Sequence, residues 1–167
     1  MASIRTVAAK NIRWQLLTTK PEGPTVDAVS TGTNASCDIA ASGSSITAGD
    51  SDKITDPAIC EDSNNGAFGT GNYTGSIAPF ILLDSEDGTY DLADNPVFEA
   101  LKVKNTVAYL VIREGAVYDS DFAAGQLVSA YEVRTDTPQR ATEMNQYIKR
   151  NIPLDVIPLF ENAVLTA

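Results

Sequence analysis

The sequence predicts one all-β domain, most simply a two-sheet β-sandwich that carries one short flanking helix and extended loops or arms. Its 167 residues suit a single domain, and a hydrophobic content of 43% is enough to build one core. Several runs of strand length alternate apolar with polar residues or concentrate β-branched and aromatic ones. Helix signals, in contrast, coincide in a single stretch.

Strand signals recur along the whole chain. The run TVAYLVIREG, residues 106–115, is continuously apolar and indicates the most buried strand. The run 128–136 alternates between two faces, and the face with Glu132 and Arg134 is expected to meet water. Pro57 places the segment 53–61 at a sheet edge, because proline removes a donor from the ladder. Further strands are predicted at 12–17, 36–41, 77–83 and 147–154.

The helix is predicted near residues 96–103. Asn95 has a side chain that can cap a helix N-terminus, and Pro96 suits the first helical position because its missing N–H would be unpaired there anyway. Val97, Phe98 and Leu101 then form an apolar stripe at spacings of three and four.

Two segments of the single domain, 1–167, are predicted to be connectors or arms. Residues 18–35 combine prolines, glycines and threonines, which favour turns or an extended conformation. The C-terminal segment, about 156–167, is apolar at Leu159, Phe160 and Leu165 but has no obvious partner in a monomer. We therefore expect this end of the chain to pack on another surface.

Charge and hydropathy exclude several classes of function. The formal net charge of −10, from 22 acidic and 12 basic residues, disfavours binding to nucleic acid phosphates or to an anionic membrane. No apolar run is long enough to cross a bilayer, and the N-terminus lacks the apolar block of a secretory signal. We expect a protein that is made and used without export.

Catalytic and metal-binding chemistry has few candidates. The chain has no histidine, which removes Ser-His-Asp and Cys-His arrangements. Cys37 and Cys60 are interpreted as reduced and mostly buried thiols. Adjacent acidic pairs such as Glu86 and Asp87 are expected to be solvated, because neighbours on a strand point to opposite faces. We predict no catalytic residue, no cofactor and no metal.

The stretch GAFGTGNYTGSIAPF, residues 66–80, places glycines around aromatic residues. It lacks the glycine spacing of a dinucleotide-binding loop, and neither a helix nor a lysine follows it as a phosphate-binding loop requires. The glycines instead indicate unusual backbone angles or the close approach of another segment. Apolar anchors here and at the C-terminal end are typical of a contact between subunits. The predicted contact residues are Phe68, Tyr73, Ile77, Leu159, Phe160 and Leu165.

Several short segments of the sequence also follow one another in a characteristic order. TDPAICEDSNNGAFGTGNYTGSIAPF, DLADNPVFEALK and TVAYLVIREG are followed by the strand that ends in TDTPQ and by QYIKRNIPL. NYTGS and TDTPQ are the most specific of them. Over residues 36–155 this order resembles the major tail proteins, or tail tube proteins, of long-tailed bacteriophages of the siphophage type, particularly those of actinobacterial hosts.

The resemblance implies a structural virion protein and no enzyme. Proteins of this kind have a β-sandwich core with a flanking helix, form hexameric rings, and stack the rings into a hollow tube through which the genome leaves the capsid. One sheet of each subunit joins its neighbours in a barrel around the lumen, while loops and arms bridge successive rings. The implied partners are further copies of the chain, a tape measure protein, and genomic DNA that passes without specific binding. The implied location is the virion tail, after assembly in the host cytoplasm.

Acidic residues are concentrated in one part of the chain. Residues 38–99 hold 12 acidic side chains and one basic one, whereas the remainder mixes 10 acidic with 11 basic side chains. In the lumen of a tube such a block would repel DNA phosphates; an acidic exterior that aids solubility is the alternative. The lumen-lining candidates are Asp84, Glu86, Asp87, Glu132 and Asp136.

Two other functions stay open from the sequence. Another virion β-protein, such as a tail terminator or a capsid decoration protein, would form single rings or trimers that do not stack. A secreted carbohydrate-binding or adhesin module would use Trp14, Tyr73 and Tyr90 to stack on sugars, and would be expected to carry a signal peptide.

Overall fold

The computed structural model describes residues 10–54, 67–68, 71–140 and 146–167. These residues form mostly β structure with two short helices, α1 (Val26–Ser30) and α2 (Pro96–Leu101). The all-β prediction is confirmed. The strands are β1 (Ile12–Leu17), β2 (Thr33–Asn34), β3 (Ser45–Ala48), β4 (Lys53–Ile54), β5 (Ala67–Phe68), β6 (Tyr73–Ile77), β7 (Val107–Glu114), β8 (Leu127–Thr135), β9 (Gln139–Arg140) and β10 (Arg150–Val164).

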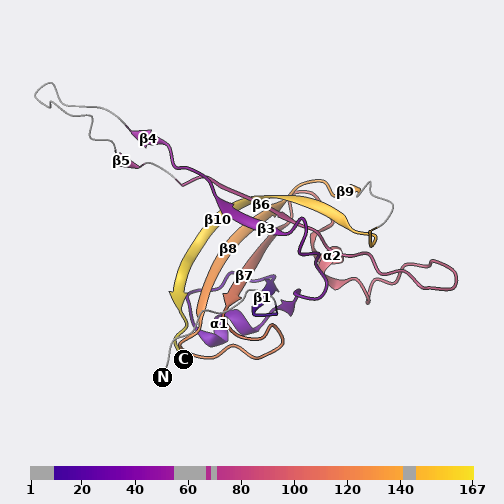
Figure 1. The fold of residues 1–167 in the computed structure, drawn as a ribbon, viewed down its shortest axis with the longest axis horizontal. Coiled ribbons are helices and arrows are strands. Elements are labelled where there is room, and N and C mark those ends of the chain that lie inside the picture. The colour runs from indigo at the N-terminus through magenta and orange to yellow at the C-terminus, as the bar shows by residue number, and fades with distance from the viewer. Residues whose placement is uncertain (1–9, 55–66, 69–70, 141–145) are drawn as a thin grey trace, which may run out of the picture.

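One antiparallel sheet contains eight of these strands. Its order is β2-β1-β7-β8-β10-β6-β3, and β9 pairs with the start of β10. The strands β4 and β5 form a separate two-stranded ribbon that projects from the body of the molecule (Figure 1). The strands predicted at 12–17, 106–115 and 128–136 are confirmed as β1, β7 and β8.

A single curved sheet stands where two packed sheets were predicted, and β10 explains the difference. This strand of 15 residues pairs with β6 over Ile152–Asp155 and with β8 from Leu154 to Val164. Its register against β8 shifts between Pro158 and Phe160 and again before Ala163. Such bulges bend a strand and increase its twist. β10 therefore curves across the molecule (Figure 1), and by pairing with both β8 and β6 it joins the two parts of the structure in one sheet.

The main core lies on one face of this sheet, under helix α2. Val97 and Leu101 of α2 are 1% and 0% exposed, so the stripe predicted for the helix packs on the sheet. The sheet side is apolar because every second residue of the central strands points toward α2. The buried residues of the main core are Leu16, Ala35, Ile39, Ile77, Val97, Leu101, Ala108, Leu110, Tyr131, Val133, Ile152, Leu154 and Val156.

A second core covers part of the opposite face. Leu17 and Val111 belong to it, whereas their sequence neighbours Leu16 and Leu110 belong to the main core, as expected for alternating side chains. Val29 of α1, Phe122 and Leu165 pack over them. Beyond this second core the same face is only partly buried at Tyr109 and Glu132, and it is exposed at Arg134 and Asp155.

The C-terminal segment predicted as an arm, about 156–167, is part of the sheet. β10 continues to Val164, Leu165 is 2% exposed in the second core, and Thr166 bridges to Thr25. Val156 and Leu165 are buried within the same chain, whereas Ile157 and Val164 stay exposed. Pro158 stands next to the first bulge, where a missing donor is tolerated. The predicted connector 18–35 likewise packs on the body, through α1 and β2.

Two predicted strands are only fragments. Segment 36–41 forms one isolated bridge, between Ile39 and Pro79. Segment 77–83 contains the end of β6 at Ile77, and beyond it Phe80 and Leu83 form isolated bridges. Pro79 has no N–H to donate, which interrupts the ladder at this point.

A buried arginine organises the loop between β7 and β8. Arg113 is 0% exposed, and its guanidinium donates to the carbonyl oxygens of Val117, Ser120 and Asp121 at 2.5, 2.8 and 3.0 Å. The guanidinium carbons of Arg113 and Arg13 lie 5.2 and 4.8 Å from the ring centroid of Phe122. Burial lowers the pKa of Arg113, but an arginine stays charged at neutral pH. The loop therefore wraps around a cation.

We expect Arg113→Met to destabilise the fold strongly. It removes a donor from three carbonyl oxygens, of which that of Ser120 keeps Arg13 and that of Val117 keeps Ser120. An unsatisfied buried group, here the Asp121 carbonyl, costs about 1–3 kcal/mol, so a loss of about 2 kcal/mol is expected. Urea unfolding followed by the fluorescence of Trp14, the single tryptophan, measures it. The matched control is Arg134→Met on exposed sheet surface, with an expected change within about 0.5 kcal/mol. Equal effects of both substitutions would contradict the role of Arg113.

Candidate assembly surfaces

The predicted contact residues separate into two groups in the structure. Ile77 and Leu165 are 0% and 2% exposed, so their side chains belong to the main and second cores of the subunit and are not available at its surface. Leu159 and Phe160 are half-buried against the second core and keep part of their surface exposed. Sequence alone marked all four as apolar but did not reveal which of them would be buried in a core of the same subunit.

Tyr73 is also half-buried and forms a small polar cluster. Its hydroxyl donates to Glu161 Oε2 at 2.6 Å, and the hydroxyl of Tyr131 donates to Glu161 Oε1 at 2.9 Å. The two rings are 6.3 Å apart. The bond to Glu161 raises the pKa of Tyr73, while burial and then Glu161 raise the pKa of Tyr131 to about 12. One carboxylate thus connects β6, β8 and the bulged part of β10.

The glycine-rich stretch contains one position where close approach explains the glycine. A Cβ atom on Gly75 would lie 2.8 Å from Val156 Cγ2 and 3.3 Å from Ile46 Cγ1. β6 therefore packs against β10 and β3 more closely than a side chain would allow. The backbone of Phe68 pairs with Lys53 in the β4–β5 ribbon. The other residues of the ribbon's connecting segment, 55–66, lie outside the described residues.

The first candidate surface is the exposed part of the sheet face opposite α2, and we call it the open face. Glu132 stands between Tyr109 and Ile157 in the register, and Arg134 stands between Val107 and Asp155. Arg134, Asp155 and Thr74 are exposed, and Ile157 is 53% exposed. Within the described chain, this face has no covering layer. At its end, Asp136 pairs with Lys104 at 3.0 Å.

The edge strand β3 is the second candidate surface. β3 pairs with β6 through Ser45–Ala48 and, within the described chain, has no strand on its other side. At the other end of the sheet the two-residue strand β2 and the residues after it cover β1, where Trp14 N–H donates to the Ser36 hydroxyl and Ala35 N–H donates to the Trp14 carbonyl. A free strand edge is a template for pairing with another chain.

The third candidate surface is the acidic hairpin, residues 82–92. Asp84 Oδ1 accepts the N–H groups of Glu86 and Asp87 at 2.7 and 3.4 Å, and Gly88 has a positive φ of 72° that completes the turn. The N–H of Thr89 donates to Asp87, which lowers the pKa of that carboxyl. The hairpin is thus a built turn and not an irregular loop.

Asn95 anchors the hairpin instead of capping helix α2 as predicted. Its side chain accepts the Leu82 N–H at 2.7 Å and donates to the carbonyl oxygens of Leu82 and Asp91 at 3.0 and 2.8 Å. No capping bond from this side chain to α2 is formed. The carboxamide of Asn95 binds the backbone of Leu82, which lies thirteen residues away and which local sequence patterns could not identify as its partner.

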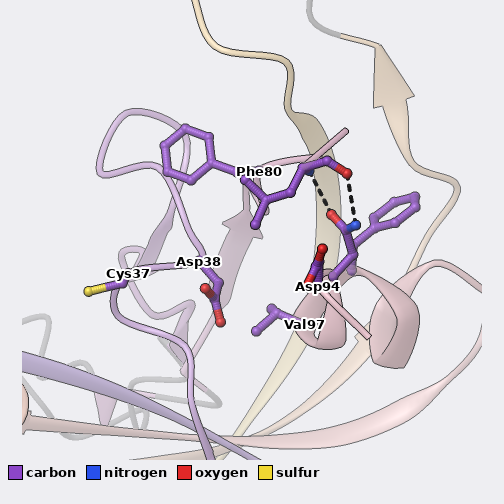
Figure 2. Close-up of a pocket in the computed structure, with 8 residues that line it drawn as sticks. Cys37, Asp38, Phe80, Asp94 and Val97 are labelled. Atoms are coloured by element: carbon purple, nitrogen blue, oxygen red, sulfur yellow. Dashed lines mark hydrogen bonds between the residues drawn. The ribbon is translucent and has the colours of Figure 1, made fainter. Parts of the chain in front are cut away.

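A small cavity lies at the base of the hairpin (Figure 2). Its volume is about 40 Å³, and Asp38 faces it across from Asp94 and Val97. Partial burial raises the pKa of Asp38. Such a space suits a water molecule better than a substrate. Among the described residues, no group of three potential ligands is placed to hold a metal ion.

Cys37 departs from the prediction of a mostly buried thiol. Its thiol is exposed, forms no disulfide with a described residue, and lines this cavity. Cys60 lies outside the described residues. Among the described helices, none combines the length and the apolar character needed to span a bilayer.

We expect Glu161→Gln to lower the pKa of Tyr131 without returning it to the ordinary value near 10. The substitution removes the charge of the acceptor, but burial, the larger cause of the shift, remains. Because the folded pKa is raised, the stability that Tyr131 contributes is complete below pH 10 and is lost as the pH rises toward 12. NMR titration of ring-labelled tyrosines measures this shift; an unchanged Tyr131 titration would contradict the cluster.

A comparison with protein-family models gives one match over nearly the whole chain. Residues 1–166 match the model of a family described as phage tail tube protein. No curated protein matches the chain in a sequence search. The match agrees with the all-β sheet and with the surfaces that the sheet leaves open for other copies. This chain therefore belongs to the phage tail tube protein family, as a structural component of the virion tail that assembles with other copies into a tube.

Proposed function

We propose that the protein forms hexameric rings that stack into the tail tube of a siphophage of actinobacteria, and that this tube is the conduit for genome delivery. The tape measure protein would fill the lumen before ejection, and DNA would then pass through it without specific binding. The hexamer, the host group and the tape measure partner come from the resemblance noted in the sequence. The fold adds support at the level of surfaces.

The observation that carries the proposal is a curved sheet with one open face and one free edge. In a ring, the β3 edge of each copy would meet a neighbour, which removes a free edge from every subunit. Since the opposite end of the sheet is the two-residue strand β2 and not a second β3, we assign the contact to two different surfaces. Contacts of that kind close into rings when the rotation between copies allows it.

The open face is the wall we assign to the lumen. Its charges are Glu132, Arg134 and Asp155, with Asp136 at its end paired to Lys104. Glu132 and Asp155 against Arg134 leave this face with one negative charge per copy, or −6 of the −60 that six copies at −10 each would carry per ring, so the potential inside a narrow bore would repel phosphates. Of the predicted lumen residues, Glu132 and Asp136 keep this role in the proposal. Asp84, Glu86 and Asp87 are in the acidic hairpin, on the α2 side of the sheet, and we assign them to contacts between subunits.

Negative-stain electron microscopy of concentrated protein tests the proposal directly. We expect hollow rods whose end-on views have sixfold symmetry, because each ring closes through six equivalent contacts. A dilution series gives the concentration at which rods appear. Protein that stays monomeric at every concentration would overturn the proposal, and single rings or trimers that never stack would favour a tail terminator or a decoration protein instead.

Charge reversal on the open face tests the assignment of the lumen. Tubes of the variant Glu132→Lys with Asp155→Lys should bind double-stranded DNA at low salt, and the binding should weaken steeply as salt is added. The control, Glu22→Lys with Asp27→Lys, changes the net charge equally at exposed positions outside the open face. Electrophoretic mobility of DNA mixed with preformed, open-ended tubes is the measurement. Equal DNA binding by both variants would place the lumen elsewhere.

A further inference from the structure

The acidic hairpin combines exposed apolar surface with acidic side chains, although Asp84 and Asp87 also hold its turn and the Tyr90 hydroxyl donates to Glu99 at 2.6 Å. Leu83 and Tyr90 face each other across its stem and are 42% and 39% exposed, and Leu92 is 61% exposed. Its turn carries Asp84, Glu86 and Asp87, and the chain between 82 and 92 contains no basic residue. The region extends away from the body beside α2 (Figure 1). Contiguous exposed apolar surface on a projecting element marks an interaction site.

A pocket on the same chain has complementary properties. It lies between β1 and the segment 36–44, and its volume is about 570 Å³. Ile12, Trp14 and Ile39 provide apolar walls, and Cys37 and Tyr118 lie on its rim. Lys10 is the single charged residue that lines it, and no ion pair of Lys10 is formed with any described residue. The pocket therefore offers apolar surface with one positive charge.

Size, polarity and charge match between these two elements. The volume lies in the range of about 300–1,000 Å³ that holds ligands of several side chains' size. Burial of Leu83 and Tyr90 against Trp14 would remove exposed apolar surface on both sides, and aromatic residues are common anchors of interfaces. The acidic turn would then lie beside Lys10, which is the favourable arrangement of opposite charges at an interface rim.

We propose that the acidic hairpin of one copy inserts its apolar stem into the Trp14 pocket of a neighbouring copy. The contact joins two different surfaces, so each subunit both gives a hairpin and receives one, as a closed ring requires. It rests on the proposed function, since it concerns contacts inside a tube, but it adds the pair of elements that recognise each other. The occupant of the pocket is a second copy of this chain.

Disulfide trapping tests the contact in the assembled protein. In a Cys60→Ser background, Cys37 is the single native thiol, and it lies on the pocket. Thr89→Cys at the exposed turn of the hairpin should give a ladder of cross-linked oligomers on a non-reducing gel after mild oxidation. The control Thr19→Cys, at an exposed position away from both elements, should give monomer. Adding Cys37→Ser should abolish the ladder; rods without any ladder would overturn the contact and leave the proposed function intact.

Charge exchange provides a second, independent measurement. Glu86→Lys or Lys10→Glu alone should raise the critical concentration for assembly about tenfold, the factor that corresponds to one charge-assisted contact. The two substitutions together should restore the parent value, because the pair is re-formed with opposite sign. Lys20→Glu, equally exposed, is the control for net charge. Additive losses in the double variant would overturn the pairing, whereas a parent protein that forms no rods at all would overturn the proposed function itself.

Discussion

The structure depends on β10 keeping hydrogen bonds on both of its edges. It joins β6 over Ile152–Asp155 and β8 from Leu154 to Val164, so a single strand unites the β6–β3 pair with the central strands. Bulges let it do so while bending, and Gly75 and Glu161 secure the bend from two sides: the glycine admits Val156, and the carboxylate accepts two tyrosine hydroxyls. The main core, the open face and the free edge all follow from this one bent strand. Such a curved and continuous sheet is the surface that subunits would share in the proposed ring.

Buried polar groups and exposed charges have different roles in this molecule. Arg113 and Asn95 are buried or nearly so, and each holds a loop through several hydrogen bonds to backbone oxygens. The mixed charges of the open face stay in water, where single ion pairs contribute little to stability. The carboxylates of the acidic hairpin accept hydrogen bonds within its turn or are exposed to solvent. Stability therefore comes from the two cores and the anchored loops, while the exposed charges remain available for steering between copies.

Local signals predicted the local structure well. The alternation in 128–136 and the β-branched run in 106–115 gave β8 and β7, because strand periodicity is written in consecutive residues. Helix α2 followed from Pro96 and its apolar stripe. What failed depended on partners far along the chain. Sequence predicts Leu165 in an arm but the structure buries it in the second core, because Val29 and Phe122 of that core are remote in sequence. The sequence around Asn95 is typical of a helix N-cap, but its side chain binds Leu82 instead. No pattern around Arg113 predicts that the residues after Gly115 fold around its guanidinium. Of the candidate site residues, the acidic ones were placed at the surface, whereas Ile77 turned out to be core.

The shortness of β3 has a consequence for how tubes grow. Its four residues, with Ser45 and Thr47 exposed, offer too few hydrogen bonds for two free subunits to remain joined for long. Closing a ring multiplies such weak contacts, because each subunit is then held on two sides at once and the effective concentration of its neighbours rises sharply. Isolated subunits would thus stay dispersed, whereas a first completed ring would act as a nucleus. Polymerisation governed by a rare nucleation event allows a virus to start one tail at one place and extend it from there.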